Sequence, residues 1–419
     1  LLFASIIIFK SYPYNDYEFY HLPYIEILRS FKIIFGLSNF EFSFGYPSIF
    51  QNINALQFNS LMELDSYVYY TPLIVGTLLG EALFKYIKQN HLVIKFISYI
   101  FIVNFLIHAN RYGSLGNDFP AHAISFFSYI LFFSIIFIDN SKDTLHLFFL
   151  TLIIAVFAKL TLLLNLLLII PLFIFKLRIF KINIRAITFI FLVIFSILLK
   201  NIINTSCLLY PINLTCFQTK WAAEKFDFSN ANIVNAYVGA LALGYKSLDL
   251  GYAENNIHFD AKEIIKKETH KNNKIYNSLS EYQKNIFEKY VVHKEYIKFG
   301  KWFKALLKNT QIKEHFEKKI LNDLIFFLFI NLILFYLYNG NYRLRISKRD
   351  DIYKLDKYHV CFFIFIIISC AIWFVKGPLL RYGISHLYVL ASIPFFIFII
   401  YFSLSIQKIS SFFNIIIVC

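Results

Sequence analysis

The chain has 419 residues, of which 58% are apolar and 20% aromatic, and its mean hydropathy is +0.58. This composition excludes an ordinary soluble domain and indicates a polytopic membrane protein. The net charge of +15 would suggest nucleic-acid binding in a soluble protein. Here the basic residues fall mainly in short loops and one hydrophilic segment, which is typical of connections between membrane spans, so no nucleic-acid partner is expected.

Apolar runs that could span a membrane recur along the chain. They cover residues 66–84, 92–108, 119–138, 144–158, 160–175, 184–200, 321–338, 358–375 and 385–404, and with a partial run at each end they make eleven segments. The two runs beside Lys159 are short, which predicts either one broken helix or two helices that meet at a membrane boundary. The end runs are too short to span, so we expect a fragment that has lost flanking sequence.

Basic residues orient these runs, because Lys and Arg are enriched in cytoplasmic loops. They occupy every second connection, at Lys85 and Lys88, at Lys142, from Lys176 to Arg185, from Arg343 to Lys357, and at Lys408. The remaining connections are then on the outer side, and all of the unusual polar motifs fall in them. This distribution predicts a single active site at the outer face of the membrane.

Three regions follow from the same pattern. They are an N-terminal membrane bundle at 1–200 with a first outer loop at 11–65, an outer helical segment at 201–320, and C-terminal membrane helices at 321–419. From Leu22 to Phe35, apolar and polar side chains alternate at helical spacing, which predicts a helix lying along the membrane interface. Helical stretches at 261–275 and 281–308 predict a small folded helical cap.

Asp16 lies in an acidic and aromatic cluster just after the first apolar run. Ionisable groups at a membrane boundary are costly, so such a carboxylate suggests function. It could act as a general base toward a hydroxyl group or ligate a divalent cation. Tyr20 is four residues after Asp16 and His21 follows it, so the carboxylate and the Tyr20 hydroxyl could share one helical face if the helix already begins there. The alternative is that Asn15 or Asp16 only caps the helix that follows.

Two further candidates lie at other outer boundaries. Asp118, in Asn117-Asp118-Phe119-Pro120, is a second possible catalytic acid, although Pro120 also suits a plain helix start capped by Asp118. Lys159 is flanked by apolar residues, so its ammonium must reach the membrane interface, form an ion pair, or face a water-filled cavity. In a water-filled cavity it could bind an anionic phosphate.

The last outer connection and the cysteines complete the set of candidates. Arg381 follows the helix-breaking Gly377-Pro378, and its planar guanidinium suits phosphate binding, although it would also be an ordinary anchor at the membrane boundary.

The five cysteines lack metal-ligand spacing, so no metal site is predicted. Cys207 and Cys216 flank an aqueous segment and could pair in an oxidising compartment.

In chain order the motifs form a series. They are Asp16-x-x-x-Tyr20-His21, Gly36-Leu37-Ser38-Asn39, Gly45-Tyr46-x-Ser48, Asn117-Asp118-Phe119-Pro120, Lys159-Leu160-Thr161, Ser206-x-Leu208-Leu209-Tyr210-Pro211, and Trp373-Phe374 to Pro378-x-x-Arg381-Tyr382-Gly383. The series resembles a group of largely uncharacterised bacterial membrane proteins that look like GT-C type glycosyltransferases. The resemblance covers most of the chain outside 222–320. Glu41 and Ser43 stand where His and Arg are more usual, and Pro47 replaces an Asn.

The resemblance implies an all-α integral membrane protein of the bacterial cytoplasmic membrane. Its fold would be a GT-C-like multi-span helical bundle, with interfacial helices in the first outer loop and a helical extramembrane segment. The site would lie on the periplasmic or extracellular side. The implied activity is sugar transfer from a polyprenyl-phosphate donor to an acceptor hydroxyl, with this donor and membrane lipids as partners.

The same resemblance implies roles for particular residues. Asp16 would be the general base and Asp118 the second acid. Donor-phosphate binding by Arg381, Lys159 and Lys376 is our inference from their charge, and the substrate cavity is expected to include Tyr20, His21, Asn117 and Tyr210. No cofactor is required by this mechanism, although a divalent metal is compatible with it.

Two other functions are compatible with the sequence. A transporter or flippase of a lipid-linked or anionic substrate would show polar residues near the middle of several spans and inverted repeats. The predicted spans are nearly bare of charge, which favours an interfacial enzyme. A polysaccharide polymerase or ligase of another fold would share location and substrate class, and the early acidic loop favours GT-C over it.

Overall fold

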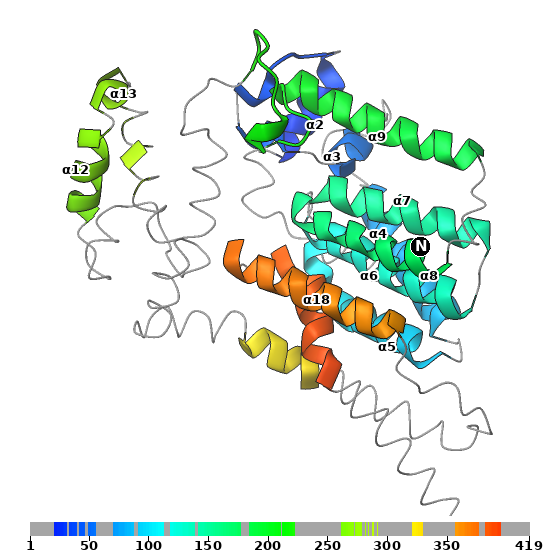
Figure 1. Cartoon of the computed structure of the whole chain (residues 1–419). Coiled ribbons are helices and arrows are strands. Elements are labelled where there is room, and N and C mark those ends of the chain that lie inside the picture. Colours follow the sequence, from blue (N-terminus) through cyan, green and yellow to red (C-terminus); the bar gives the residue numbers. More distant parts are fainter. Residues whose placement is uncertain are drawn as a thin grey trace, which may run out of the picture.

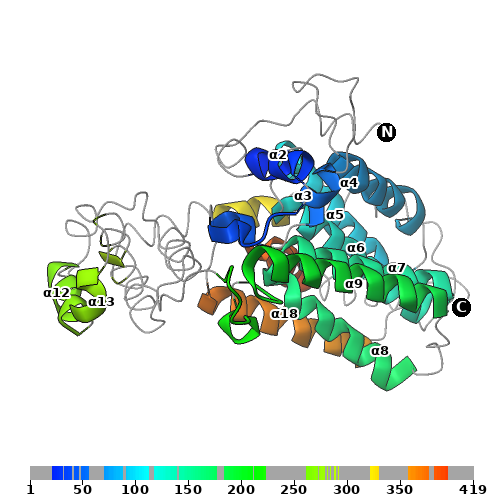
Figure 2. The ribbon, with the colours of Figure 1, turned by 90° about the horizontal axis from the view of Figure 1, so that it is seen from above.

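A computed structural model of the chain describes residues 21–31, 33–39, 42–46, 49–55, 70–87, 91–112, 118–138, 141–176, 184–210, 212–222, 261–271, 273–278, 281, 284, 287–288, 291, 321–329, 357–376 and 382–394. Within these ranges the chain forms helices and no strand. Most of the helices lie side by side in one bundle, whereas α12 (Ala261–Lys271) and α13 (Asn273–Ser278) stand apart from it (Figures 1 and 2).

The bundle helices coincide with the predicted apolar runs. They are α4 (Tyr70–Glu81) continued by η4 (Ala82–Tyr86), α5 (Leu92–Tyr112), α6 (Asp118–Phe137), α7 (Lys142–Ala158), η5 (Leu160–Leu168), α8 (Ile169–Lys176), α9 (Ile184–Thr205) and α18 (Lys357–Lys376), together with helical residues 321–329 and 382–394. Among the described helices, three are long and apolar enough to cross a membrane, at Asp118–Phe137, Ile187–Thr205 and Lys357–Phe374. The prediction of a helical protein with membrane-like segments is therefore confirmed.

Helix α6 is the centre of the bundle, and α9 lies at its edge. In the most apolar 18-residue stretch of α6, 94% of the residues are buried inside the protein, whereas in the corresponding stretch of α9 only 17% are buried. Phe126, Phe132 and Phe133 of α6 are fully buried among the neighbouring helices. An α9 side chain that protein does not cover, such as Phe191 or Phe195, is stable only against lipid or another apolar surface.

The chain breaks at Lys159, between α7 and η5. Lys159 has an extended backbone (φ −150°, ψ 113°), and η5 begins at the next residue. Of the two possibilities that the sequence left open, the structure has two helical segments that meet at Lys159. The break leaves the Lys159 side chain at the end of both segments, away from the apolar middle of each.

The first outer loop folds into short helices at the end of α9 (Figure 1). It contains α2 (Leu22–Ser30), η2 (Leu37–Asn39), η3 (Phe42–Gly45) and α3 (Ile49–Ala55). The prediction that the interfacial helix continues to Phe35 is wrong, because α2 ends at Ser30 and Phe31 is extended. The chain must leave the helix there to bring Gly36 to the end of α9.

Backbone carbonyls explain why the loop docks at this place. The last turn of a helix leaves its carbonyls without partners inside the helix. In α9 the oxygen of Ile203 accepts from the Gly36 N–H at 2.9 Å, and that of Asn204 accepts from the Ser38 hydroxyl at 3.0 Å. The Trp221 indole N–H donates to the oxygen of Ile202 at 3.1 Å. The first outer loop and the segment after α9 thus complete the hydrogen bonding of this helix end.

Gly36 is required by this arrangement, so substituting alanine is expected to destabilise the protein. Its φ is +70°, and a Cβ there would lie 2.9 Å from the carbonyl oxygen of Trp221. We expect Gly36→Ala to lower the free energy of unfolding by at least about 1–2 kcal/mol, measured by thermal or denaturant unfolding in detergent.

The matched control for this prediction is Gly80→Ala in α4. Gly80 lies in a regular helix with open space around the position of a Cβ. Alanine there is expected to be neutral or stabilising by up to about 1 kcal/mol. Equal destabilisation by both substitutions would contradict the role given to Gly36.

The segment after α9 is a compact disulfide-linked turn, residues 206–221. Cys207 and Cys216 form a disulfide, the pairing that the sequence left open. The backbone N–H of Leu208 donates to the oxygen of Thr215 at 2.9 Å, and the N–H of Phe217 donates to Ser206 at 2.7 Å. These bonds hold the turn against the end of α9.

Candidate functional site

Side chains from three parts of the bundle meet at one polar junction, formed by Asp118, Lys159 and Tyr382. Asp118 begins α6, Lys159 separates α7 from η5, and Tyr382 is the first described residue of the helical segment 382–394. The Lys159 ammonium forms an ion pair with the Asp118 carboxylate and lies 4.1 Å from the centre of the Tyr382 ring. The two charged side chains are 22% and 19% exposed, so the junction is accessible from outside the bundle.

Two electrostatic features act on the Asp118 carboxylate, its position in the helix and its partner. The N-terminal end of a helix carries a partial positive charge, which stabilises an anion in the first turn. The opposite charge of Lys159 acts in the same direction. The helix-start interpretation and the functional interpretation of Asp118 are therefore compatible, since one carboxylate satisfies both.

A line of polar side chains, the polar seam, continues from the junction into the bundle. On α6, His122, Ser125 and Tyr129 follow Asp118 at spacings of four, three and four residues, which places them on one helix face. All three are buried, and the facing partners are Asn165 of η5 and Ser385 and His386 of the last described helix.

Hydrogen bonds join the members of the polar seam. Asn165 accepts from the Tyr129 hydroxyl at 3.1 Å and donates to Ser125 at 2.9 Å. The Ser385 hydroxyl lies 2.8 Å from Nδ1 of His122 and 3.1 Å from Nδ1 of His386. The other ring nitrogen of His386 is buried and has no hydrogen-bond partner among the described residues. An unsatisfied buried nitrogen costs about 1–3 kcal/mol, so this position is one where a polar ligand or water would be stabilised.

Only some of the predicted site residues fall in the described part of the chain. Asp16, Tyr20, Asn117 and Arg381 lie outside the described residues, as does the side chain of Lys376. The end runs and most of the cap predicted within 222–320 also lie outside them. For these, the assigned roles stay predictions.

The structure brings Asp118 and Lys159 into direct contact, so of the alternatives that the sequence left open for Lys159, its ammonium pairs with an anion. His21 and Tyr210 lie elsewhere. His21 is buried and its Nδ1 lies 2.6 Å from Nε2 of Gln51 in α3, so it joins the start of α2 to α3. The buried Tyr210 ring packs against Tyr46, with centroids 5.4 Å apart.

Two polar residues inside apolar runs were not singled out from the sequence, Asn165 of the polar seam and Lys200 at some distance from it. Lys200, near the end of α9, donates to Asn52 Oδ1 of α3 at 2.5 Å. A lysine at the end of a span that is predicted to be outer departs from the positive-inside pattern, and that signal would have identified it. Asn165 stands alone in a run of leucines, and a lone amide in an apolar run is the corresponding signal.

Within the described residues, no three His, Cys, Asp or Glu side chains are grouped so that they could hold a metal ion. The chemistry available at the junction is that of a carboxylate, an ammonium and a phenol. A carboxylate can accept a proton, and an ammonium can stabilise a phosphate.

Comparison with known proteins gives one match. A family model described as "Domain of unknown function (DUF8201)" matches residues 1–240, which is more than half of the chain. No curated protein and no solved structure matches the chain. The matched region includes the first outer loop, Asp118, Lys159 and the disulfide-linked turn.

Proposed function

Because the chain belongs to the family of this domain of unknown function, DUF8201, its activity must be inferred from its own residues, and we propose that it is a membrane-embedded glycosyltransferase. It would transfer a sugar from a polyprenyl-phosphate donor to an acceptor hydroxyl. The reaction would take place at the outer face of a bacterial cytoplasmic membrane, within a multi-span bundle of GT-C type.

The observation that supports the proposal is the polar junction. A carboxylate and an ammonium, each about one fifth exposed, form an ion pair where α6 begins and α7 ends, and Phe50 of α3 packs against the same helix ends. In the proposed reaction a lipid-borne donor and an aqueous acceptor would meet at this place. Charged groups are rare elsewhere in the apolar helices, and those retained in such helices are usually functional.

The location proposed for the site rests on two further features. The disulfide Cys207–Cys216 lies beside the end of α9, and disulfides persist in oxidising compartments such as the periplasm. The starts of α7, α9 and α18 carry Lys142, Arg185 and Lys357, which the positive-inside bias assigns to the cytoplasm. Both features support an outer junction.

In the proposed reaction, the acceptor hydroxyl gives its proton to the Asp16 carboxylate as its oxygen attacks the anomeric carbon. The bond between that carbon and the donor phosphate oxygen breaks, and polyprenyl phosphate leaves with the electron pair. Lys159, oriented by Asp118, would stabilise the charge that develops on the leaving phosphate, together with Lys376 and Arg381. Asp118 is then a positioning residue for Lys159.

A transporter or flippase of an anionic or lipid-linked substrate is the second candidate, and the polar seam favours it. His122, Asn165 and His386 lie in the interior of the bundle, where a transporter keeps its polar groups. The polar seam contains no Asp, Glu, Lys or Arg side chain among its named members, and the charged groups Asp118 and Lys159 lie at one end of it. We therefore prefer the glycosyltransferase to the transporter.

The test is a reconstitution that measures transfer and transport in the same vesicles. Purified protein in proteoliposomes is supplied with a labelled sugar on polyprenyl phosphate and with candidate glycan acceptors. We expect labelled glycan and free polyprenyl phosphate, and a decrease of at least about 100-fold in Asp16→Asn. The neighbouring acid provides the control, because Glu18→Gln should keep the activity.

Two results would contradict this proposal. Full transfer by Asp16→Asn would exclude it as the base. Movement of the intact lipid-linked sugar across the bilayer, without release of polyprenyl phosphate, would favour the transporter instead.

A further inference from the structure

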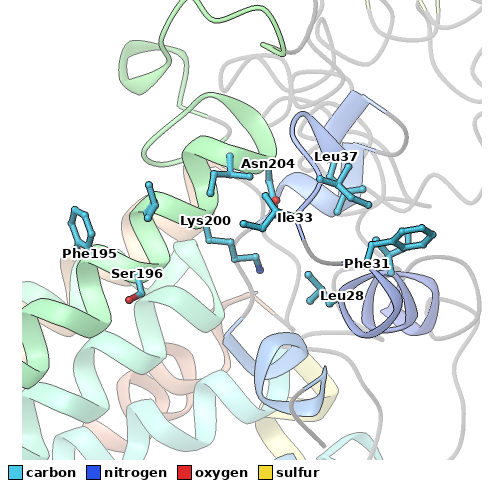
Figure 3. A pocket seen from close by; sticks show the side chains of 12 residues that line it. Leu28, Phe31, Ile33, Leu37, Phe195, Ser196, Lys200 and Asn204 are labelled. Atoms are coloured by element: carbon cyan, nitrogen blue, oxygen red, sulfur yellow. The ribbon is translucent and has the colours of Figure 1, made fainter. Parts of the chain in front are cut away.

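A cavity of about 250 Å³ lies between α2 and α9 (Figure 3). Its wall is formed by Ile27, Leu28, Phe31, Ile33, Ile34, Leu37, Phe195, Ser196, Leu199, Lys200, Ile203 and Asn204. The lining is apolar except for Ser196, Lys200 and Asn204. A single cation therefore stands in a hydrocarbon-like groove.

The mouth of the cavity is surrounded by exposed apolar side chains. Phe31 is 59% exposed, Ile33 66% and Phe195 52%. Contiguous exposed apolar surface of this kind marks contact with a membrane or a partner. Because α9 is also one of the three helices that could span a membrane, the groove opens toward lipid when α9 spans.

Lys200 extends from α9 into the groove (Figure 3). Its ammonium donates to Asn52 Oδ1 at 2.5 Å and lies 4.9 Å from the centre of the Tyr24 ring. Among the described residues it has no carboxylate partner. An ammonium has three donors, of which Asn52 takes one, and a cation in an apolar wall is costly without an anion.

The neighbouring phenol does not supply that anion. Tyr24 is buried, and burial raises its pKa above the ordinary value, while the hydrogen bond from Asn204 acts in the opposite direction and is the smaller effect. Its hydroxyl accepts from the Asn204 amide at 3.1 Å. Tyr24 therefore stays neutral at physiological pH and offers Lys200 only the face of its ring.

We propose that this groove binds an anionic phospholipid of the bilayer, with the lipid phosphate on Lys200 and the first part of an acyl chain along α2 and α9. The cavity volume supports a bilayer lipid over the sugar donor. Pockets that enclose a whole small ligand measure roughly 300–1,000 Å³, so this cavity holds only the phosphate and the chain next to it, and the remainder lies in the bilayer. The site is independent of the proposed sugar transfer and requires only that α9 faces lipid.

The proposal is tested by native mass spectrometry and melting curves of the full chain in detergent. The probes are palmitoyl-oleoyl phosphatidylglycerol, its zwitterionic phosphatidylcholine analogue, and polyprenyl phosphate. We expect phosphatidylglycerol to bind in preference to phosphatidylcholine and to raise the melting temperature. In Lys200→Met its affinity should fall about tenfold, the size expected for one charge-assisted hydrogen bond.

Three further variants keep the test decisive. Lys200→Arg keeps the charge and should keep the binding. Ser196→Trp fills the mouth of the groove from the exposed face of α9 and should abolish binding even if Lys200→Met fails to fold. Lys220→Met, an exposed lysine in the disulfide-linked region, should bind phosphatidylglycerol as the wild type does.

Three outcomes would overturn the proposal. One is equal affinity for the anionic and the zwitterionic lipid. A second is unchanged phosphatidylglycerol binding in both Lys200→Met and Ser196→Trp. The third is binding of polyprenyl phosphate with none of phosphatidylglycerol, which would assign the groove to the carrier of the transfer reaction.

Discussion

Replacing Asp118 by asparagine is expected to reduce sugar transfer by about 100- to 1,000-fold, the usual effect of losing one preorganised electrostatic contact to a developing charge. The substitution keeps the size of the side chain but leaves Lys159 without the anion that orients it. The measurement is kcat/KM in the vesicle assay. Stability should fall as well, by roughly 1–2 kcal/mol, because the junction is partly exposed and water screens the remaining charge.

A double substitution separates the two roles of this pair. Asp118→Asn with Lys159→Met removes both charges, so it should recover most of the stability lost in Asp118→Asn, while transfer stays low. Lys159→Met alone should cost less stability than Asp118→Asn, because the N-terminal end of α6 still stabilises the carboxylate. Recovery of transfer together with stability in the double variant would show that the pair is only structural.

Removing the disulfide Cys207–Cys216 should destabilise the turn after α9. The bridge closes a loop with a sequence separation of 9, and loop-closure entropy for a ring of this size corresponds to about 2.5 kcal/mol. We expect Cys216→Ser to lower the melting temperature and to release the turn from the end of α9. Unfolding curves with and without reductant measure the effect.

The free cysteines supply the control for that experiment. Cys361 and Cys370 are unpaired in α18, so Cys361→Ser should melt like the wild type and should respond to reductant as the wild type does. Cys207→Ser, Cys216→Ser and the double variant should have the same melting temperature. A wild-type curve that does not change on reduction would contradict a stabilising role for the bridge.

Long apolar runs predicted the helices well, because burial in lipid or in a protein core selects the same residues. The run at 119–138 became α6 (Asp118–Phe137), and the run at 358–375 became α18 (Lys357–Lys376). The amphipathic pattern after Leu22 was less reliable. Periodicity cannot show that the chain must leave the helix at Phe31 so that Gly36 can reach α9.

The candidate site was predicted only in part, for a related reason. Asp118 and Lys159 could be found because each is a charge at the edge of an apolar run. Asn165 and Lys200 could not be assigned a partner, since their hydrogen-bond partners are 36, 40 and 148 residues away. The likeness to GT-C enzymes stays a prediction, because no curated or solved relative compares with this chain.

The contacts between the first outer loop and the end of α9 also determine the order in which this end of the bundle assembles. Ser38 and Asn204 are 166 residues apart, so the loop is synthesised long before its acceptor carbonyls exist. At 5–20 residues per second the delay is roughly 10–30 s. During that time α2 cannot pack against α9, so its apolar surface is uncovered. An amphipathic helix in this state is stabilised by lying at the membrane interface. Synthesis of the end of α9 and its disulfide-linked turn would then be the step that completes these contacts.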